Sequence, residues 1–245
     1  MIFWAPWWLF LAAATAIGII GYREYSGLVM GHGIPRPGVF GLLAGLVVLL
    51  APQQHLLLLG LSLLTVLALG TALRYENLGD VLPQVAAAFL GGLYTFAPWR
   101  FASLLRDESP YWLFFALSIC WIGDSVAFYV GRSFGKHRIA PVVSPKKSWE
   151  GAIGSVFGSV IYGVAFMHYF VPEAPSWQIA VMAVAGNVAG QFGDLAESAM
   201  KRGAGVKDSG TILPGHGGLL DRIDAGLFSL PVVYACVAVQ KDLLL

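Results

Sequence analysis

Eight apolar segments recur along this chain of 245 residues, and most have about the length that a helix needs to cross a lipid bilayer. A helix crosses about 30 Å of hydrocarbon with about 20 apolar residues, and only the second segment is clearly shorter. The segments lack the alternation of barrel strands, and backbone groups in lipid must be bonded within their own segment, so we expect helices. They are residues 3–20, 38–51, 55–73, 81–97, 110–130, 151–171, 177–193 and 219–239.

The composition agrees with this reading. Hydrophobic residues make up 57% of the chain and charged residues 12%, whereas soluble domains are about 25% charged. We therefore predict an all-α, polytopic integral membrane protein with about eight transmembrane helices. We divide it into N-terminal transmembrane helices, 1–105, and C-terminal helices, 106–245, that carry the polar loops. The first apolar segment has no basic residues before it, so we interpret it as a retained span rather than a cleaved signal.

Lysine and arginine predict the orientation. If the N-terminus lies outside, twelve of the fifteen basic residues fall on one side and three, Arg100, Arg106 and Lys241, on the other. Basic residues are enriched in cytoplasmic loops, so the first side is predicted to be cytoplasmic. It then carries the two most polar loops, Arg132–Glu150 and Asp194–Asp224.

Charge is concentrated in the second of these loops. Five of the fourteen acidic residues and four basic residues fall between positions 191 and 225. If 194–202 is helical, Asp194, Glu197, Ser198 and Lys201 share one face. The plain alternative is an ordinary pair of Glu197 with Lys201, beside solvated acids.

Asp221 and Asp224 are likewise three residues apart, at the start of the last span. Together with the acids of 194–202 they could form an oxygen-rich site of the kind that Mg²⁺ takes with substrate phosphates. Six glycines of this loop would let backbone N–H groups approach an anion, or would simply turn the chain: Gly203, Gly205, Gly210, Gly215, Gly217 and Gly218. His216 lacks the neighbouring ligands that a zinc site would need.

The first polar loop carries a basic patch of Lys136, His137, Arg138, Lys146 and Lys147. Such a patch could grip phosphates, although flanking of the spans by positive charge also explains it.

Two further sites carry charge in or beside apolar segments. Asp124 lies inside an apolar run, where a carboxylate is costly and marks a functional site, with a nearby cation or a metal as its partner. Arg23 and Glu24 follow the first segment and could pair with each other.

Two long motifs resemble one family. SAMKRGAGVKDSGTILPGHGGLLDRIDA resembles the signature of phosphatidate cytidylyltransferases, also called CDP-diacylglycerol synthases. IGDSVAFYVGRSFGKHRIAPVVSPKKSWEG resembles a second diagnostic block of the same family. The two motifs cover about a quarter of the chain.

The resemblance implies a membrane nucleotidyltransferase of phospholipid biosynthesis, which converts CTP and phosphatidic acid to CDP-diacylglycerol and pyrophosphate. It implies Mg²⁺ as cofactor, with one cation or two left open, held by Asp194, Asp221 and Asp224. Binding of substrate falls to Lys146, Lys147, Glu197 and Ser198. The residues assigned to catalysis are Asp124, Lys201, Arg202, Lys207, Asp208, His216 and Arg222. Among them, Asp208 and His216 would order the glycine-rich loop.

The expected partners are CTP, phosphatidic acid and membrane lipid. The net charge of +1 argues neither for nor against nucleic acid, and the family implies none; a homodimer stays open beside a monomer. The expected location is a bacterial-type inner (plasma) membrane, which the chain crosses several times with its active site on the cytoplasmic side. Two rivals remain: a lipid kinase that uses CTP and releases CDP, and a transporter with Asp124 and Asp194 as ion relays.

Overall fold

The computed structural model describes residues 1–212, 214–215 and 217–242, with the backbone alone at 241–242. A short 3-10 turn, Leu78–Asp80, precedes α4, and the two strands are β1 (Arg138–Ala140) and β2 (Ser144–Ser148). The helices in the described ranges are α1 (Trp7–Gly31), α2 (Val39–Leu50), α3 (Gln54–Ala72), α4 (Val81–Glu108), α5 (Pro110–Phe134), α6 (Trp149–Phe170), α7 (Ser176–Gly203) and α8 (Leu220–Asp242).

Six of these helices, α3 to α8, are long and apolar enough to cross a membrane. The helix α2 has only 12 residues, in line with its short apolar segment. The helix α1 ends at Gly31, eleven residues beyond the predicted end at 20, so it includes both Arg23 and Glu24. The prediction of an all-α, polytopic membrane protein is confirmed.

The chain forms two compact units. The N-terminal unit comprises Pro6–Arg100 and Met200–Arg222. The C-terminal unit comprises Met1–Ala5, Phe101–Ala199 and the chain from Ile223 onward. The connection between α7 and α8 therefore belongs to the N-terminal unit.

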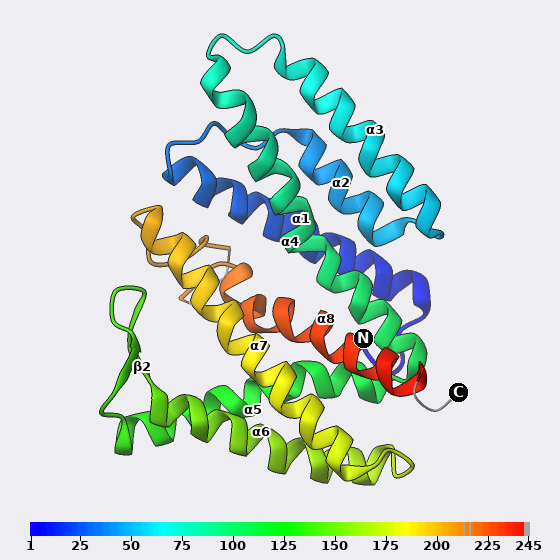
Figure 1. Cartoon of the computed structure of the whole chain (residues 1–245), viewed down its shortest axis with the longest axis vertical. Coiled ribbons are helices and arrows are strands. Elements are labelled where there is room, and N and C mark those ends of the chain that lie inside the picture. The colour runs from blue at the N-terminus through cyan, green and yellow to red at the C-terminus, as the bar shows by residue number, and fades with distance from the viewer. Residues whose placement is uncertain (213, 216, 243–245) are drawn as a thin grey trace. The chain divides into compact units, whose positions relative to one another are not determined.

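In the C-terminal unit, α5 and α6 run side by side, and the β1–β2 hairpin joins them at one end (Figure 1). The helices approach closely at Gly151, where a Cβ atom would come within 2.9 Å of the Ala127 carbonyl oxygen. The strands are antiparallel, with Arg138 opposite Ser148. Ser148 also begins α6, because its hydroxyl oxygen accepts the Gly151 N–H at 3.2 Å. The hairpin is thereby held against the helix pair.

In the N-terminal unit, the buried Phe96 of α4 packs where Gly18 and Gly45 leave room. The segment after α7 contacts the end of α1: Ala204 lies against Gly31, and the Met200 carbonyl is 3.0 Å from the His32 ring. The helix α3 leaves most of its leucines exposed, as expected for a helix that faces lipid. The polar connection between α7 and α8 is thus anchored on α1.

Candidate active site

The predicted site residues fall into both units, and each unit has a cavity lined by some of them. In the C-terminal unit a cavity of about 630 Å³ lies between the hairpin, α5, α6 and α7. Its charged lining residues are Asp124, Arg132, Arg138, Lys146, Lys147 and Asp194. Four cations around two carboxylates make this cavity suited to a polyanion that binds with a metal ion.

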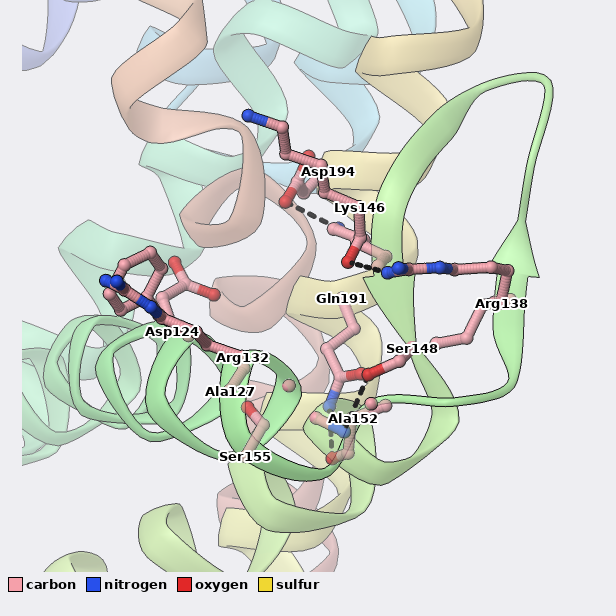
Figure 2. Close-up of a pocket in the computed structure, with 16 residues that line it drawn as sticks. Asp124, Ala127, Arg132, Arg138, Lys146, Ser148, Ala152, Ser155, Gln191 and Asp194 are labelled. Carbon is pink, nitrogen blue, oxygen red and sulfur yellow. Dashed lines mark hydrogen bonds and ion pairs between the residues drawn. The ribbon is translucent and has the colours of Figure 1, made fainter.

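The hairpin positions the cations of this cavity. Arg138 extends from β1 toward the strand that carries Lys146, and its guanidinium donates to the Lys146 carbonyl at 2.9 Å (Figure 2). Glu150, in the first turn of α6, accepts the backbone N–H groups of Lys136 and His137 and lies 2.6 Å from the His137 ring. Glu150 therefore holds the start of the hairpin against the start of α6. The sequence pattern did not predict a role for Glu150.

The helix α7 carries the carboxylate that meets these cations. The Lys147 Nζ lies 2.5 Å from one Asp194 oxygen, and the Ser198 hydroxyl donates to the other at 3.3 Å. The predicted helix over residues 194–202 is confirmed, because α7 runs unbroken from Ser176 to Gly203. Its spacing places Asp194, Glu197, Ser198 and Lys201 along one side of the helix. An ion pair between a partly exposed lysine and a partly exposed carboxylate contributes little on its own, so a phosphate can compete for the lysine.

Asp124 lies in α5, as the intramembrane acid was predicted to do, and lines the same cavity. Glu197 is different. Its side chain is completely buried, and it does not line either of the two described cavities. Its placement favours a role within the fold of the C-terminal unit rather than contact with substrate.

In the N-terminal unit, Asp221 organises the connection between α7 and α8. One of its oxygens pairs with the Lys201 Nζ at 2.5 Å. The other accepts from the backbone N–H groups of Ser209 and Gly218 and from the Ser209 hydroxyl, at 3.0, 2.7 and 3.0 Å. A metal ion bound by Asp221 would share the carboxylate with these four donors.

Glu24 also organises this connection. Its carboxylate accepts the backbone N–H groups of Leu219 and Leu220, at 2.9 and 2.7 Å, where α8 begins. A negative charge at a helix N-terminus bonds N–H groups that lack partners in the helix and opposes the positive end of the helix dipole. The sequence allowed a pair of Arg23 with Glu24, whereas the described bonds of Glu24 go to the start of α8.

The second cavity, of about 460 Å³, lies in this connection. Lys207, Asp208 and Arg222 line it together with four glycine or proline residues, at 210, 214, 215 and 217. Gly215 and Gly217 have φ angles of +74° and +81°, which disfavour any residue with a Cβ atom. The path of the chain therefore requires glycine at positions 215 and 217.

The remaining predicted residues are placed as follows. The Arg202 guanidinium donates to the Val206 carbonyl at 3.1 Å, at the end of α7. Asp224 accepts the Ala225 N–H at 2.7 Å within the first turns of α8. His216 lies outside the described residues. Within the part of the chain that the structure describes, no three His, Cys, Asp or Glu side chains are grouped as ligands of one metal ion.

Residues 1–240 match the model of the cytidylyltransferase family. The chain belongs to this family.

Three similar relatives, each named phosphatidate cytidylyltransferase, come from Staphylococcus haemolyticus (strain JCSC1435), Staphylococcus aureus (strain COL) and Staphylococcus epidermidis (strain ATCC 12228 / FDA PCI 1200). They are 32%, 32% and 31% identical to this chain, over 90% of its length and 86% of theirs.

Proposed function

We propose that this protein transfers the cytidylyl group of CTP to phosphatidic acid, which yields CDP-diacylglycerol and pyrophosphate in phospholipid biosynthesis. Membership of the cytidylyltransferase family across residues 1–240 is the observation that carries this proposal. The names of the relatives specify the lipid substrate. A cavity lined by both cations and carboxylates, beside apolar helices, suits a nucleotide that must meet a lipid phosphate.

The reaction does not need a strong general base. An oxygen of the lipid phosphate attacks the α-phosphorus of CTP, a new P–O bond forms, and the bond to the β-phosphate breaks. Since the attacking oxygen is already anionic, the barrier lies in bringing two anions together while pyrophosphate departs. Fixed cations lower that barrier by positioning both substrates and by balancing the charge that develops.

In the C-terminal unit we assign the phosphates of CTP to Arg132, Arg138, Lys146 and Lys147, all of which line one cavity. In this assignment Lys147 exchanges its bond with Asp194 for a bond to phosphate. In the N-terminal unit, Lys207 and Arg222 line the other cavity and supply a second pair of phosphate-binding cations. Lys201 and Asp208 support that pair through the connection between α7 and α8.

A divalent cation such as Mg²⁺ fits the donors of the first cavity, because Asp124 and Asp194 are both carboxylates that line it. Magnesium prefers such oxygens and completes its shell with water and substrate phosphates. When bound, it would supply Lewis-acid neutralisation of phosphate charge. Asp221 and Asp224 remain proposed ligands as well, and the number of cations is left to titration.

The same proposal places the site on the cytoplasmic side of the membrane, where CTP is available. The excess of lysine and arginine in the loops on that side supports this orientation. The exposed leucine face of α3 suits contact with lipid, and would equally serve self-association into a homodimer.

The test is turnover of the purified protein in detergent, with phosphatidic acid and CTP labelled at the α-phosphate, in Mg²⁺ or in chelator. Transfer of label into lipid with release of pyrophosphate is the expected result. Consumption of CTP with release of CDP and no label in lipid would indicate a lipid kinase instead. Folded protein that consumes no CTP would refute the proposal, and label transfer that survives the chelator would refute the cofactor.

A further inference from the structure

A chain of buried hydrogen bonds links three helices beneath the cavity of the C-terminal unit. The Ser159 hydroxyl of α6 bonds the Ile119 carbonyl of α5 at 2.6 Å, and the Asn187 amide of α7 bonds the Ser159 oxygen at 2.8 Å. Asn187 in turn accepts from the Gln191 amide at 2.7 Å. Ser159 and Asn187 are 0% and 2% exposed, so each polar atom here must be bonded within the protein.

The chemistry of the partners fixes which way each amide points. A carbonyl oxygen only accepts, so Ser159 spends its one hydrogen on Ile119 and can only accept from Asn187. Asn187 must therefore turn its NH₂ group toward Ser159 and its oxygen toward Gln191. Gln191 then meets that oxygen with its own NH₂ group.

The Ala152 carbonyl independently fixes the same orientation of the Gln191 amide. It accepts from the Gln191 NH₂ group at 3.2 Å (Figure 2). Both amide hydrogens of Gln191 are thereby used, on Ala152 and on Asn187. The Gln191 side-chain oxygen has no hydrogen-bond partner among the described residues, and Gln191 lines the cavity with Asp194 and the basic residues. Gln191 thus offers a ligand an acceptor and no donor.

An acceptor held in this way discriminates between the two substrates of the proposed reaction. Ionised phosphatidic acid carries phosphate and ester oxygens, which accept hydrogen bonds and would gain nothing from Gln191. CTP carries the hydroxyl groups of ribose and the amino group of cytosine, which donate. An acceptor that the protein already orients favours a ligand with a matching donor over an analogue without it.

We propose that Gln191 is a specificity-determining residue, whose side-chain oxygen accepts a hydrogen bond from the ribose 2′-hydroxyl or from the cytosine amino group of CTP. This rests on the proposed function and assigns the nucleotide to the cavity of the C-terminal unit. Ser159 and Asn187 act as positioning residues, because they hold the amide of Gln191 in the orientation that presents its oxygen.

The experiment compares kcat/KM for CTP, dCTP and UTP in the intact protein and in Gln191→Met. The methionine variant keeps the length of the side chain and removes the acceptor. Loss of one such hydrogen bond is expected to lower kcat/KM for CTP about tenfold. If the ribose 2′-hydroxyl is the donor, kcat/KM for dCTP stays near its original value. If the cytosine amino group is the donor, kcat/KM for UTP stays near its original value.

Two further variants keep the test decisive. Gln191→Asn retains the amide but shortens the side chain by one methylene. The same fall in kcat/KM for CTP relative to the other nucleotides is expected, so the test stands even if the methionine variant folds poorly. Gln178→Met changes the same residue type on the same helix, away from the cavity, and is expected to leave all three values unchanged.

An equal loss with all three nucleotides in folded Gln191 variants would overturn the inference and indicate a structural role. If the intact protein fails to use CTP at all, the proposed function fails, which is a separate outcome.

Discussion

Removal of the Glu24 carboxylate should release the connection between α7 and α8 at the point where α8 begins. Its two short bonds, to the N–H groups of Leu219 and Leu220, are 2.9 and 2.7 Å long. The Ser209 hydroxyl lies 3.4 Å from Glu24 and 3.0 Å from Asp221, so its single hydrogen goes mainly to Asp221. We therefore count only the two backbone bonds for Glu24.

A hydrogen bond to a charged group contributes about 1.5–3 kcal/mol to stability. Glu24→Ala should thus cost the local structure about 3–6 kcal/mol, twice the contribution of one such bond. The lower figure corresponds to an increase of about 100-fold in the population of the opened connection. Glu24→Gln keeps one acceptor oxygen but sets an NH₂ group against the other N–H, so its effect should be intermediate.

Hydrogen–deuterium exchange of the protein in detergent, read by mass spectrometry over residues 203–222, measures this opening directly. Faster exchange should be confined to that segment, and turnover of CTP should fall with it. Glu76→Ala, at an exposed acid of the same unit, serves as the control. Unchanged exchange in Glu24→Ala would show that Glu24 does not hold the start of α8.

Three other changes test the cavities and the packing. Lys147→Met should raise KM for CTP at least tenfold with little change in thermal stability, because the partly exposed pair with Asp194 contributes on the order of 1 kcal/mol; an unchanged KM would exclude Lys147 from phosphate binding. Asp221→Asn should abolish label transfer while leaving membrane insertion intact, and substantial turnover by this variant would count against its assigned role. Gly123→Ala would place a Cβ atom 2.2 Å from the Asn187 amide nitrogen, so we expect a lower melting temperature than for Gly70→Ala, which meets nothing within 4 Å; equal melting temperatures would mean that α5 can shift at no cost.

The class of fold could be determined from the sequence because the bilayer constrains each segment locally. A helix in lipid must form all its backbone hydrogen bonds within itself and must be apolar over the thickness of the bilayer. Segment length and hydropathy are therefore enough to find it. The same argument placed Asp124 among the functional candidates, since a carboxylate in an apolar run is costly wherever its partners lie. The charged motifs also carried the resemblance to the family without any structure.

The partners of the polar residues depended on tertiary structure. Glu24 and Leu220 are separated by 195 intervening positions and meet only because the connection after α7 packs on α1. Glu197 carries the same carboxylate as Asp194, three residues away on the same helix, yet it is buried while Asp194 reaches Lys147.

In the sequence, Gln191 and Asn187 are two polar residues within the apolar segment 177–193. Their role follows only from hydrogen-bond partners on α5 and α6. Hydropathy depends on one segment at a time, whereas the direction of a hydrogen bond depends on what the fold places opposite it.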